Sequence, residues 1–207
     1  MSFLREQFQL LITFLNTDFR KSVIYCGIAM LAIMLLGGVV GLAFPEVVEE
    51  SLAMFMAAVE EAGVMDEQGN LSVFALLANN WSAMLMSAAY GLIPFVFLPA
   101  LSLFSNSFLI GVMAAWYHTN GIYLVVFAAG ILPHGIFELP ALVLSIACGM
   151  YLCRSLSRTI TGKQDKKSLI EVFCGILRVL LLMVAPMTVA AAFIECYITP
   201  LFIELFL

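Results

Sequence analysis

Charged residues and histidines are scarce in this sequence. Only 11% of the 207 residues are charged, against about 25% in average soluble proteins, and only two are histidines. The 9 Lys and Arg and the 14 Asp and Glu side chains cannot cover the surface of a soluble domain of this size. The composition also excludes a disordered chain and a nucleic-acid-binding module, because both depend on abundant charge.

The motifs of several familiar classes are missing as well. The five cysteines are odd in number and have neither paired nor metal-binding spacing, so no disulfide framework is implied. The sequence contains no phosphate-binding loop, no serine triad and no HExxH metalloprotease helix. We therefore expect no cofactor and no catalytic residue.

Long apolar runs take the place of these features. Hydrophobic residues make up 63% of the chain, and a helix needs about 20 consecutive apolar residues to cross a membrane. An outer-membrane barrel would instead show alternating strands of about ten residues. The sequence predicts an all-α, polytopic membrane helix bundle with about five transmembrane spans, one of them broken or re-entrant.

We predict one integral membrane domain over residues 1–207. Residues 1–21 form an amphipathic cytoplasmic segment, 45–79 an acidic extracytoplasmic connector, and 154–167 a basic cytoplasmic loop. Within the connector we expect a helix with one wet face, closed by a turn at Asp66–Asn70. The predicted spans are 22–44, 81–104, one crossing within 107–132, 136–153 and 168–193.

The distribution of charge predicts the orientation. Arg5, Arg20 and Lys21 precede the first span, and the 154–167 loop is also basic, whereas the 45–79 connector contains no Lys or Arg. Basic loops stay in the cytoplasm, so an even number of spans must separate the two basic regions. We therefore expect a multi-pass plasma-membrane protein with a cytoplasmic N-terminus and an extracytoplasmic C-terminus.

Polar residues mark the expected helix ends. Asn80 is the predicted N-cap of the second span, and Ser105–Ser107 is a predicted tight connection. The stretches 118–121 and 133–135 interrupt the apolar sequence. They leave two alternatives, in which 107–132 is either one kinked span or a span followed by a re-entrant segment.

Four ionisable residues are candidates for a functional role. His134 and Glu138 are four residues apart, so a helix places them on one face, where they can bind one metal or share a proton. His118 is a candidate third member, and the alternative is a hydrogen-bonded pair that caps a helix start. Arg178 lies inside the last span and needs a partner such as Asn106, unless it extends to the cytoplasmic interface.

Two motifs resemble a known family. Residues 133–141, PHGIFELPA, resemble the PHGxxELPA signature of the stage II sporulation protein M family. Residues 106–111 resemble its NGxxLG element, with Ser107 in place of the usual glycine, and Asn79–Asn80 also fits. The resemblance implies an integral membrane protein. The sporulation member of that family belongs to a complex with peptidoglycan hydrolases. The candidate functional residues are His134, Gly135, Glu138, Pro140, Asn106, Arg178 and His118.

Three functions follow as hypotheses. The first is a non-enzymatic scaffold that recruits cell-envelope enzymes in a sporulation-like complex through the 45–79 connector. The second is a transporter or an export and immunity component, which interrupted helices at membrane depth favour. The third is an intramembrane metal-dependent hydrolase that uses His134 and Glu138. The expected partners are the lipid bilayer and membrane or extracytoplasmic proteins, with a homo-oligomer left open and no nucleic acid.

Overall fold

The described part of the chain consists of helices. The computed structural model describes residues 3–64 and 71–206, and no strand occurs among them. This confirms the predicted all-α bundle, although the expected turn at 66–70 lies outside the described residues. The helices are α1 (Phe3–Leu15), α2 (Phe19–Ala43), α3 (Pro45–Glu61), α4 (Val73–Ala89), η1 (Tyr90–Leu92), α5 (Pro99–Thr119), α6 (Leu124–Ile160), α7 (Lys166–Val179), η2 (Leu180–Val184), α8 (Ala185–Tyr197) and α9 (Thr199–Glu204).

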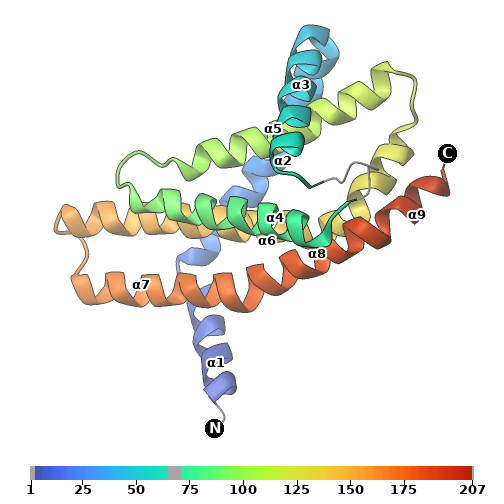
Figure 1. The fold of residues 1–207 in the computed structure, drawn as a ribbon. Coiled ribbons are helices and arrows are strands. Elements are labelled where there is room, and N and C mark those ends of the chain that lie inside the picture. Colours follow the sequence, from blue (N-terminus) through green and yellow to red (C-terminus); the bar gives the residue numbers. More distant parts are fainter. Residues whose placement is uncertain (1–2, 65–70, 207) are drawn as a thin grey trace.

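Four long helices of the described residues are apolar enough to cross a membrane. They are α2, α5, α6 and the continuous helix Lys166–Tyr197, in which α7 and α8 join through the π-helical turn η2. The shorter α4, with 17 residues, packs beside α6 and α8 as a fifth rod (Figure 1). Helix α6 lies at the centre of the bundle, where it contacts every other one of these helices.

Small residues set the closest helix contact, between α2 and α5. A Cβ atom at Gly37 would collide with the backbone carbonyl of Phe108, and one at Gly111 with that of Met34. A Cβ atom at Gly41 would lie 2.8 Å from the Cβ of Ala115. The small-residue pattern in the first span therefore serves packing within the chain, where it lets two backbones approach closely.

The predicted second span is wrong in its boundaries. Helix α4 begins after Ser72, whose hydroxyl accepts a hydrogen bond from the Ala75 amide at 3.4 Å, so Asn80 lies inside the helix and is not its N-cap. The helix ends at Ala89, and the chain turns through residues 90–98 before α5. Pro94 keeps the helix from continuing, because proline removes a backbone donor, and Pro99 begins α5, where a missing donor costs little.

The turn at 90–98 is held against α6. Phe95 and Phe97 adopt positive φ angles of 68° and 53°, and the amide of Phe95 donates to the Ser157 hydroxyl at 2.9 Å. Gly91 lies so near Gly149 of α6 that a Cβ atom would collide with its backbone. Apart from Gly91 and Pro94 this stretch is apolar, so the sequence reads as part of one continuous span.

The predicted connection at Ser105–Ser107 is also wrong. These residues lie inside α5, where their side chains bond to carbonyls of the preceding turn. Asn106 Nδ2 donates to the Ser102 carbonyl at 2.9 Å, and Ser107 Oγ to the Leu103 carbonyl at 2.6 Å. A polar residue that bonds back to its own helix needs no break in that helix.

Neither alternative for residues 107–132 is correct. Helix α5 ends at Thr119, Gly121 supports the following turn with a φ of 71°, and α6 then continues from Leu124 for 37 residues. Pro133 and Pro140 lie inside α6, which bends in its first third (Figure 1). Proline explains the bend, because it breaks one backbone hydrogen bond without ending the helix.

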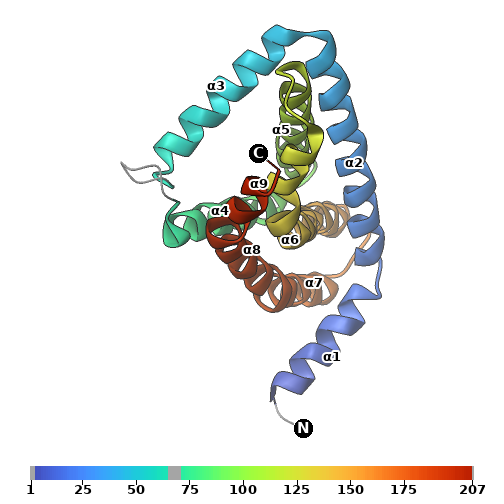
Figure 2. The same cartoon turned by 90° about the vertical axis from the view of Figure 1, so that its right-hand side faces the viewer.

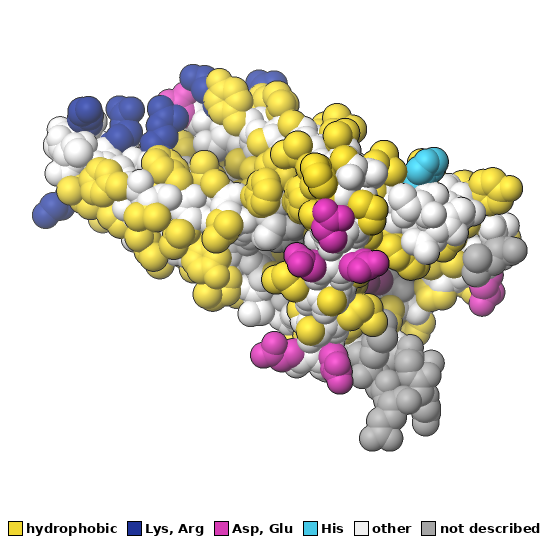
Figure 3. Space-filling model, turned by 90° about the horizontal axis from the view of Figure 1, so that it is seen from above, with side chains coloured by type: hydrophobic (Ala, Val, Ile, Leu, Met, Phe, Trp, Pro, Cys, Tyr) yellow, Lys and Arg dark blue, Asp and Glu magenta, His cyan; other side chains and the backbone are white. Residues whose placement is uncertain are grey.

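Helix α3 lies at the edge of the bundle. It runs diagonally from the end of α2 towards the beginning of α4 (Figure 2), and it contacts α2 and α5. Its five glutamates are exposed: Glu46, Glu49, Glu50, Glu60 and Glu61. Seen from above, Lys and Arg gather at one end of the molecule, and most acidic side chains lie towards the middle and the other end (Figure 3).

Candidate functional site

A cavity of about 680 Å³ lies between α3, α4, α5, α6, α8 and α9. The helix segments that line it lie at the end of the bundle away from the turn between α6 and α7 (Figure 1). Apolar side chains of α3 and α5, among them Phe55, Leu109 and Met113, form one wall. The polar residues that line it are Asn79, Asn80, Asn106, His134, Glu138, Glu195 and Thr199.

Three ionisable side chains meet in this cavity. His134 and Glu138 lie on one face of α6, with 3.7 Å between Nε2 and the nearer carboxylate oxygen Oε2. Glu195 comes from α8, and one ligand atom of each residue lies within 4.8 Å of the others. The side chains of His134 and Glu138 are 14% and 25% exposed, so the cluster is shielded but still reached from the cavity.

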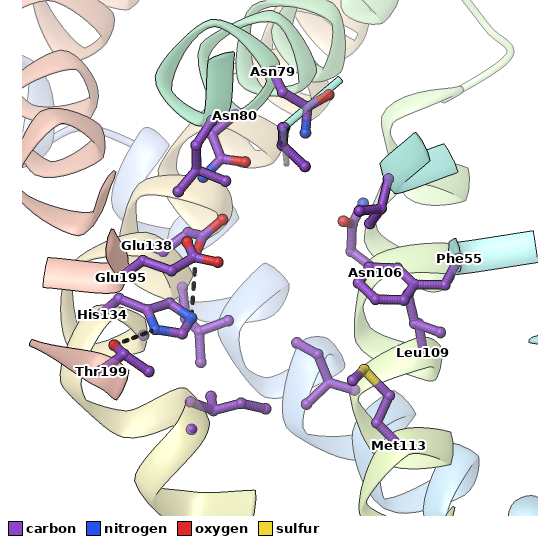
Figure 4. A pocket seen from close by; sticks show the side chains of 18 of the residues that line it. Phe55, Asn79, Asn80, Asn106, Leu109, Met113, His134, Glu138, Glu195 and Thr199 are labelled. Atoms are coloured by element: carbon purple, nitrogen blue, oxygen red, sulfur yellow. Dashed lines mark hydrogen bonds and ion pairs between the residues drawn. The ribbon is translucent and has the colours of Figure 1, made fainter. Parts of the chain in front are cut away.

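The imidazole of His134 has a second partner. Its Nδ1 atom lies 3.2 Å from the hydroxyl Oγ1 of Thr199, at the start of α9, and Thr199 itself is buried. With Nδ1 engaged, Nε2 faces Glu138 (Figure 4). The hydrogen bond thus fixes the orientation of the ring, as outer hydrogen bonds do for histidines that bind metals.

Asparagines extend the polar surface beyond the cluster. Asn80 of α4 lies above Glu138 and Glu195 along the same wall, and Asn106 faces them across the opening (Figure 4). The amide nitrogen of Asn80 is buried and has no hydrogen-bond partner among the described residues. A buried donor without a partner is costly, so this amide is set up to meet a ligand or water in the cavity.

The electrostatics of the cluster favour a positive charge. Two carboxylates approach each other in apolar surroundings, where like charges repel more strongly than in water. Neither carboxylate forms an ion pair with Lys or Arg among the described residues. The arrangement can bind a cation between oxygen and nitrogen ligands.

The structure places the predicted residues at different distances from this site. His134, Glu138 and Asn106 line the cavity, and so does Gly135, where a Cβ atom would come within 3.2 Å of Ile131. Pro140 is exposed and does not line it.

The prediction of His118 as a third member of the cluster is wrong. His118 is exposed in the last turn of α5, at the end of the helix, and it does not line the cavity. Glu195 takes its place.

Arg178 has a partner other than the predicted one. Its Nε donates to Gln7 Oε1 of α1 at 2.8 Å, whereas Asn106 lines the cavity. Helix α1 packs against α7, so its polar face lies within reach of the arginine. The amphipathic N-terminal segment thereby compensates a charge in the last long helix.

Sequence reasoning missed Thr199 and the role of Glu195. The one sequence signal is the carboxylate of Glu195, which stands alone near the end of an apolar run; Thr199 has no such signal. His134 and Thr199 are 65 residues apart, and no spacing rule connects two helices over that distance. The cavity itself forms between six helices that are distant in the sequence, and local residue patterns do not encode such an arrangement.

Comparison with known proteins agrees with the motif that crosses this site. The family model described as Stage II sporulation protein M matches residues 28–200, which include every polar residue that lines the cavity. The chain belongs to the stage II sporulation protein M family. It is also 32% identical over 126 residues to an uncharacterized protein of Methanocaldococcus jannaschii, covering 61% of this chain and 70% of that protein. No solved structure matches the chain.

The structure shows where the family signature lies relative to the cavity. In this stage II sporulation protein M family chain, residues 133–141 form the bend of α6 and bring His134 and Glu138 into the cavity. The second motif brings Asn106 from α5 to the opposite wall, and Asn80 comes from α4. Motifs that are far apart in the sequence therefore line one cavity.

Proposed function

We propose that this protein binds a small polar or cationic substrate in the cavity and moves it across the plasma membrane, without a catalytic step. One observation carries the proposal: Asn106 of one family motif and His134 and Glu138 of the other line a single cavity of about 680 Å³. Ligand sites are typically cavities of about 300–1,000 Å³ with mostly apolar walls and a few convergent polar groups.

Irregular helices beside the cavity support movement. Transporter sites are commonly built on discontinuous helices, which allow one part of a bundle to rotate against another. Here α6 bends at Pro133 and Pro140, and the π-helical turn η2 joins α7 to α8, the helix that contributes Glu195. Both irregular segments lie on helices that contribute to the ionisable cluster.

The orientation is part of the proposal. The turn between α6 and α7 carries Lys163 and is flanked by further basic residues, so the positive-inside rule assigns it and the N-terminus to the cytoplasm. Helix α3, the turn between α5 and α6, and the C-terminus then lie outside. In this orientation the cavity-lining residues of α3 and α9 lie towards the outside, and the lining reaches Asn106 in the first half of α5.

Alternating access can be tested without knowledge of the substrate. Cys174 and Cys196, which are partly exposed, are replaced by serine, and Leu109→Cys is introduced in the apolar cavity wall. A membrane-impermeant maleimide should label Leu109→Cys from both intact cells and inverted vesicles. The control Glu60→Cys on α3 should react only in intact cells, and Lys163→Cys only in inverted vesicles. Labelling of Leu109→Cys from the outside alone would refute transport.

The acidic face of α3 favours a second candidate, the scaffold. The five exposed glutamates share this helix with Met54 and Met56, which are 75% and 57% exposed. Such a surface suits a basic extracytoplasmic protein better than an anionic lipid surface. A photocrosslinker at Glu60 should capture a specific protein if the scaffold role holds, with Tyr25 on the outer face of α2 as the lipid-facing control.

A further inference from the structure

The ligand atoms of His134, Glu138 and Glu195 form a compact set. One nitrogen and two carboxylate oxygens, from two helices, lie within 4.8 Å of one another. Atoms at such separations can reach a single ion at about 2.0–2.2 Å with small side-chain rotations. Helix α6 supplies two of the three ligands at an i, i+4 spacing, which places them on one face.

Two surrounding residues complete the features expected of a metal site. Thr199 engages Nδ1 of His134 at 3.2 Å and leaves Nε2 directed at Glu138. Asn80 brings a buried amide without a partner to the same wall. An amide can present either its oxygen or its nitrogen, so Asn80 offers a fourth ligand or a hydrogen bond to a metal-bound water.

We propose that His134, Glu138 and Glu195 bind one divalent transition-metal cation, and that this cation is the substrate of the cavity. This inference rests on the proposed transport function. The donor set determines this class. Imidazole and carboxylate ligands together suit Zn²⁺ or Mn²⁺, whereas Ca²⁺ and Mg²⁺ take oxygen ligands alone. Three protein ligands leave a coordination position open to the cavity, through which an ion can enter and leave.

Metal titration of the full-length protein tests the proposal directly. The purified chain in detergent, freed of metal with a chelator, is titrated calorimetrically with ZnCl₂, with MnCl₂ and with MgCl₂. We expect one ion per chain for the wild type, and bound Mn²⁺ should give an altered electron paramagnetic resonance spectrum. Binding of neither ion, or binding of Mg²⁺ equally well, would overturn the assignment.

Variants locate the ion at this cluster. Glu138→Gln and Glu195→Gln keep size and hydrogen bonding but remove one charge, and each should weaken binding at least about 100-fold. Thr199→Val should weaken it by about 10–100-fold, as expected for a partner of a ligating histidine. The matched controls are His118→Gln and Glu60→Gln, which replace exposed residues outside the cavity and should leave the affinity unchanged.

Each result decides a separate question. If Glu138→Gln and Glu195→Gln elute as monodisperse protein and bind Zn²⁺ as tightly as the wild type, the ion lies elsewhere and the inference fails. Absence of metal binding together with labelling of Leu109→Cys from both sides would refute the metal while leaving transport intact. Metal binding together with labelling from the outside alone would keep the metal site and refute its role as a transported substrate.

Discussion

His134 of α6 and Thr199 of α9 hold each other in place across the bundle: Nδ1 lies 3.2 Å from Oγ1, and the hydroxyl is buried. The contact joins the family signature to the last helix and determines which ring nitrogen faces Glu138. It also closes the cavity on the side of α9, whose residues line it.

Removal of this hydroxyl should loosen α9 and the imidazole together. Thr199→Val keeps the shape of the side chain but leaves Nδ1 of a largely buried histidine without a partner, at a cost of about 1–3 kcal/mol. We expect a lower thermal unfolding temperature in detergent. Thr199→Ser, which restores a hydroxyl, should recover most of the loss, and equal unfolding temperatures for valine and serine would show that the bond contributes nothing.

A second prediction compares two glycines of α2. A Cβ atom at Gly37 collides with the backbone carbonyl of Phe108, whereas one at Gly27 meets nothing within 4 Å. Gly37→Ala should therefore separate α2 from α5 and destabilise the protein by about 1–3 kcal/mol, as overpacking does. Gly27→Ala should be neutral or stabilising by up to about 1 kcal/mol, because alanine is the better helix former.

The two variants are compared by thermal unfolding. They are also compared by disulfide crosslinking between a cysteine at Phe108 of α5 and a cysteine at either Met34 or Gly38 of α2. The crosslinking yield should fall only with Gly37→Ala. If both alanine variants unfold at the same temperature as the wild type, the close contact between α2 and α5 is not what stabilises the bundle.

The contact between Gln7 and Arg178 predicts an energetic coupling. Arg178→Leu should insert at least as well as the wild type, because removal of an arginine from a helix centre favours insertion by roughly 2.5–3.5 kcal/mol. The same change removes the donor that holds α1 at Gln7 Oε1, so proteolysis of α1 should become faster.

A double-mutant cycle measures this bond. Gln7→Leu, Arg178→Leu and the double variant should show a coupling of about 1 kcal/mol in the unfolding free energy. Strict additivity would mean that Arg178 is compensated by the cytoplasmic interface and not by Gln7. The neighbouring Gln9, whose side chain makes no hydrogen bond among the described residues, serves as the control in Gln9→Leu.

The sequence predicted the class of fold well because hydrophobic content alone determines it. It predicted α1, α2 and the connector helix closely, since charged residues or proline mark their ends. It failed around Ser105–Ser107 and 133–135, where polar residues and proline suggest breaks. In the structure the serines bond back to their own helix, and α6 tolerates its prolines as a bend.

The sequence predicted one part of the candidate site, the part that depends on local spacing within one helix, and missed the part that depends on packing between helices. The i, i+4 spacing of His134 and Glu138 is local, so it can be read from the sequence. Glu195 and Thr199 join them only through the packing of α8 and α9 on α6, a tertiary contact between helices. Arg178 shows the same limit, since its partner Gln7 lies 171 residues away.

The last prediction separates a site from a structural pair at Glu138. Glu138 and Glu195 lie close together in apolar surroundings, so the metal-free protein bears a repulsion that a neutral residue would relieve. Glu138→Gln should therefore unfold at the same or a higher temperature than the wild type in the presence of a chelator. Zn²⁺ should raise the unfolding temperature of the wild type, because it binds only the folded state, and should leave that of Glu138→Gln almost unchanged.

A structural pair would differ from a functional site in activity and metal binding. If Glu138 served only as a hydrogen-bond partner of His134, glutamine would preserve stability and function, and Glu138→Leu would lose about 1–3 kcal/mol by leaving the histidine unpaired. A functional site predicts instead that glutamine and leucine abolish metal binding equally while only leucine lowers the stability. Stable Glu138→Gln protein without metal binding would be the mark of a residue that is kept for function at some cost in stability.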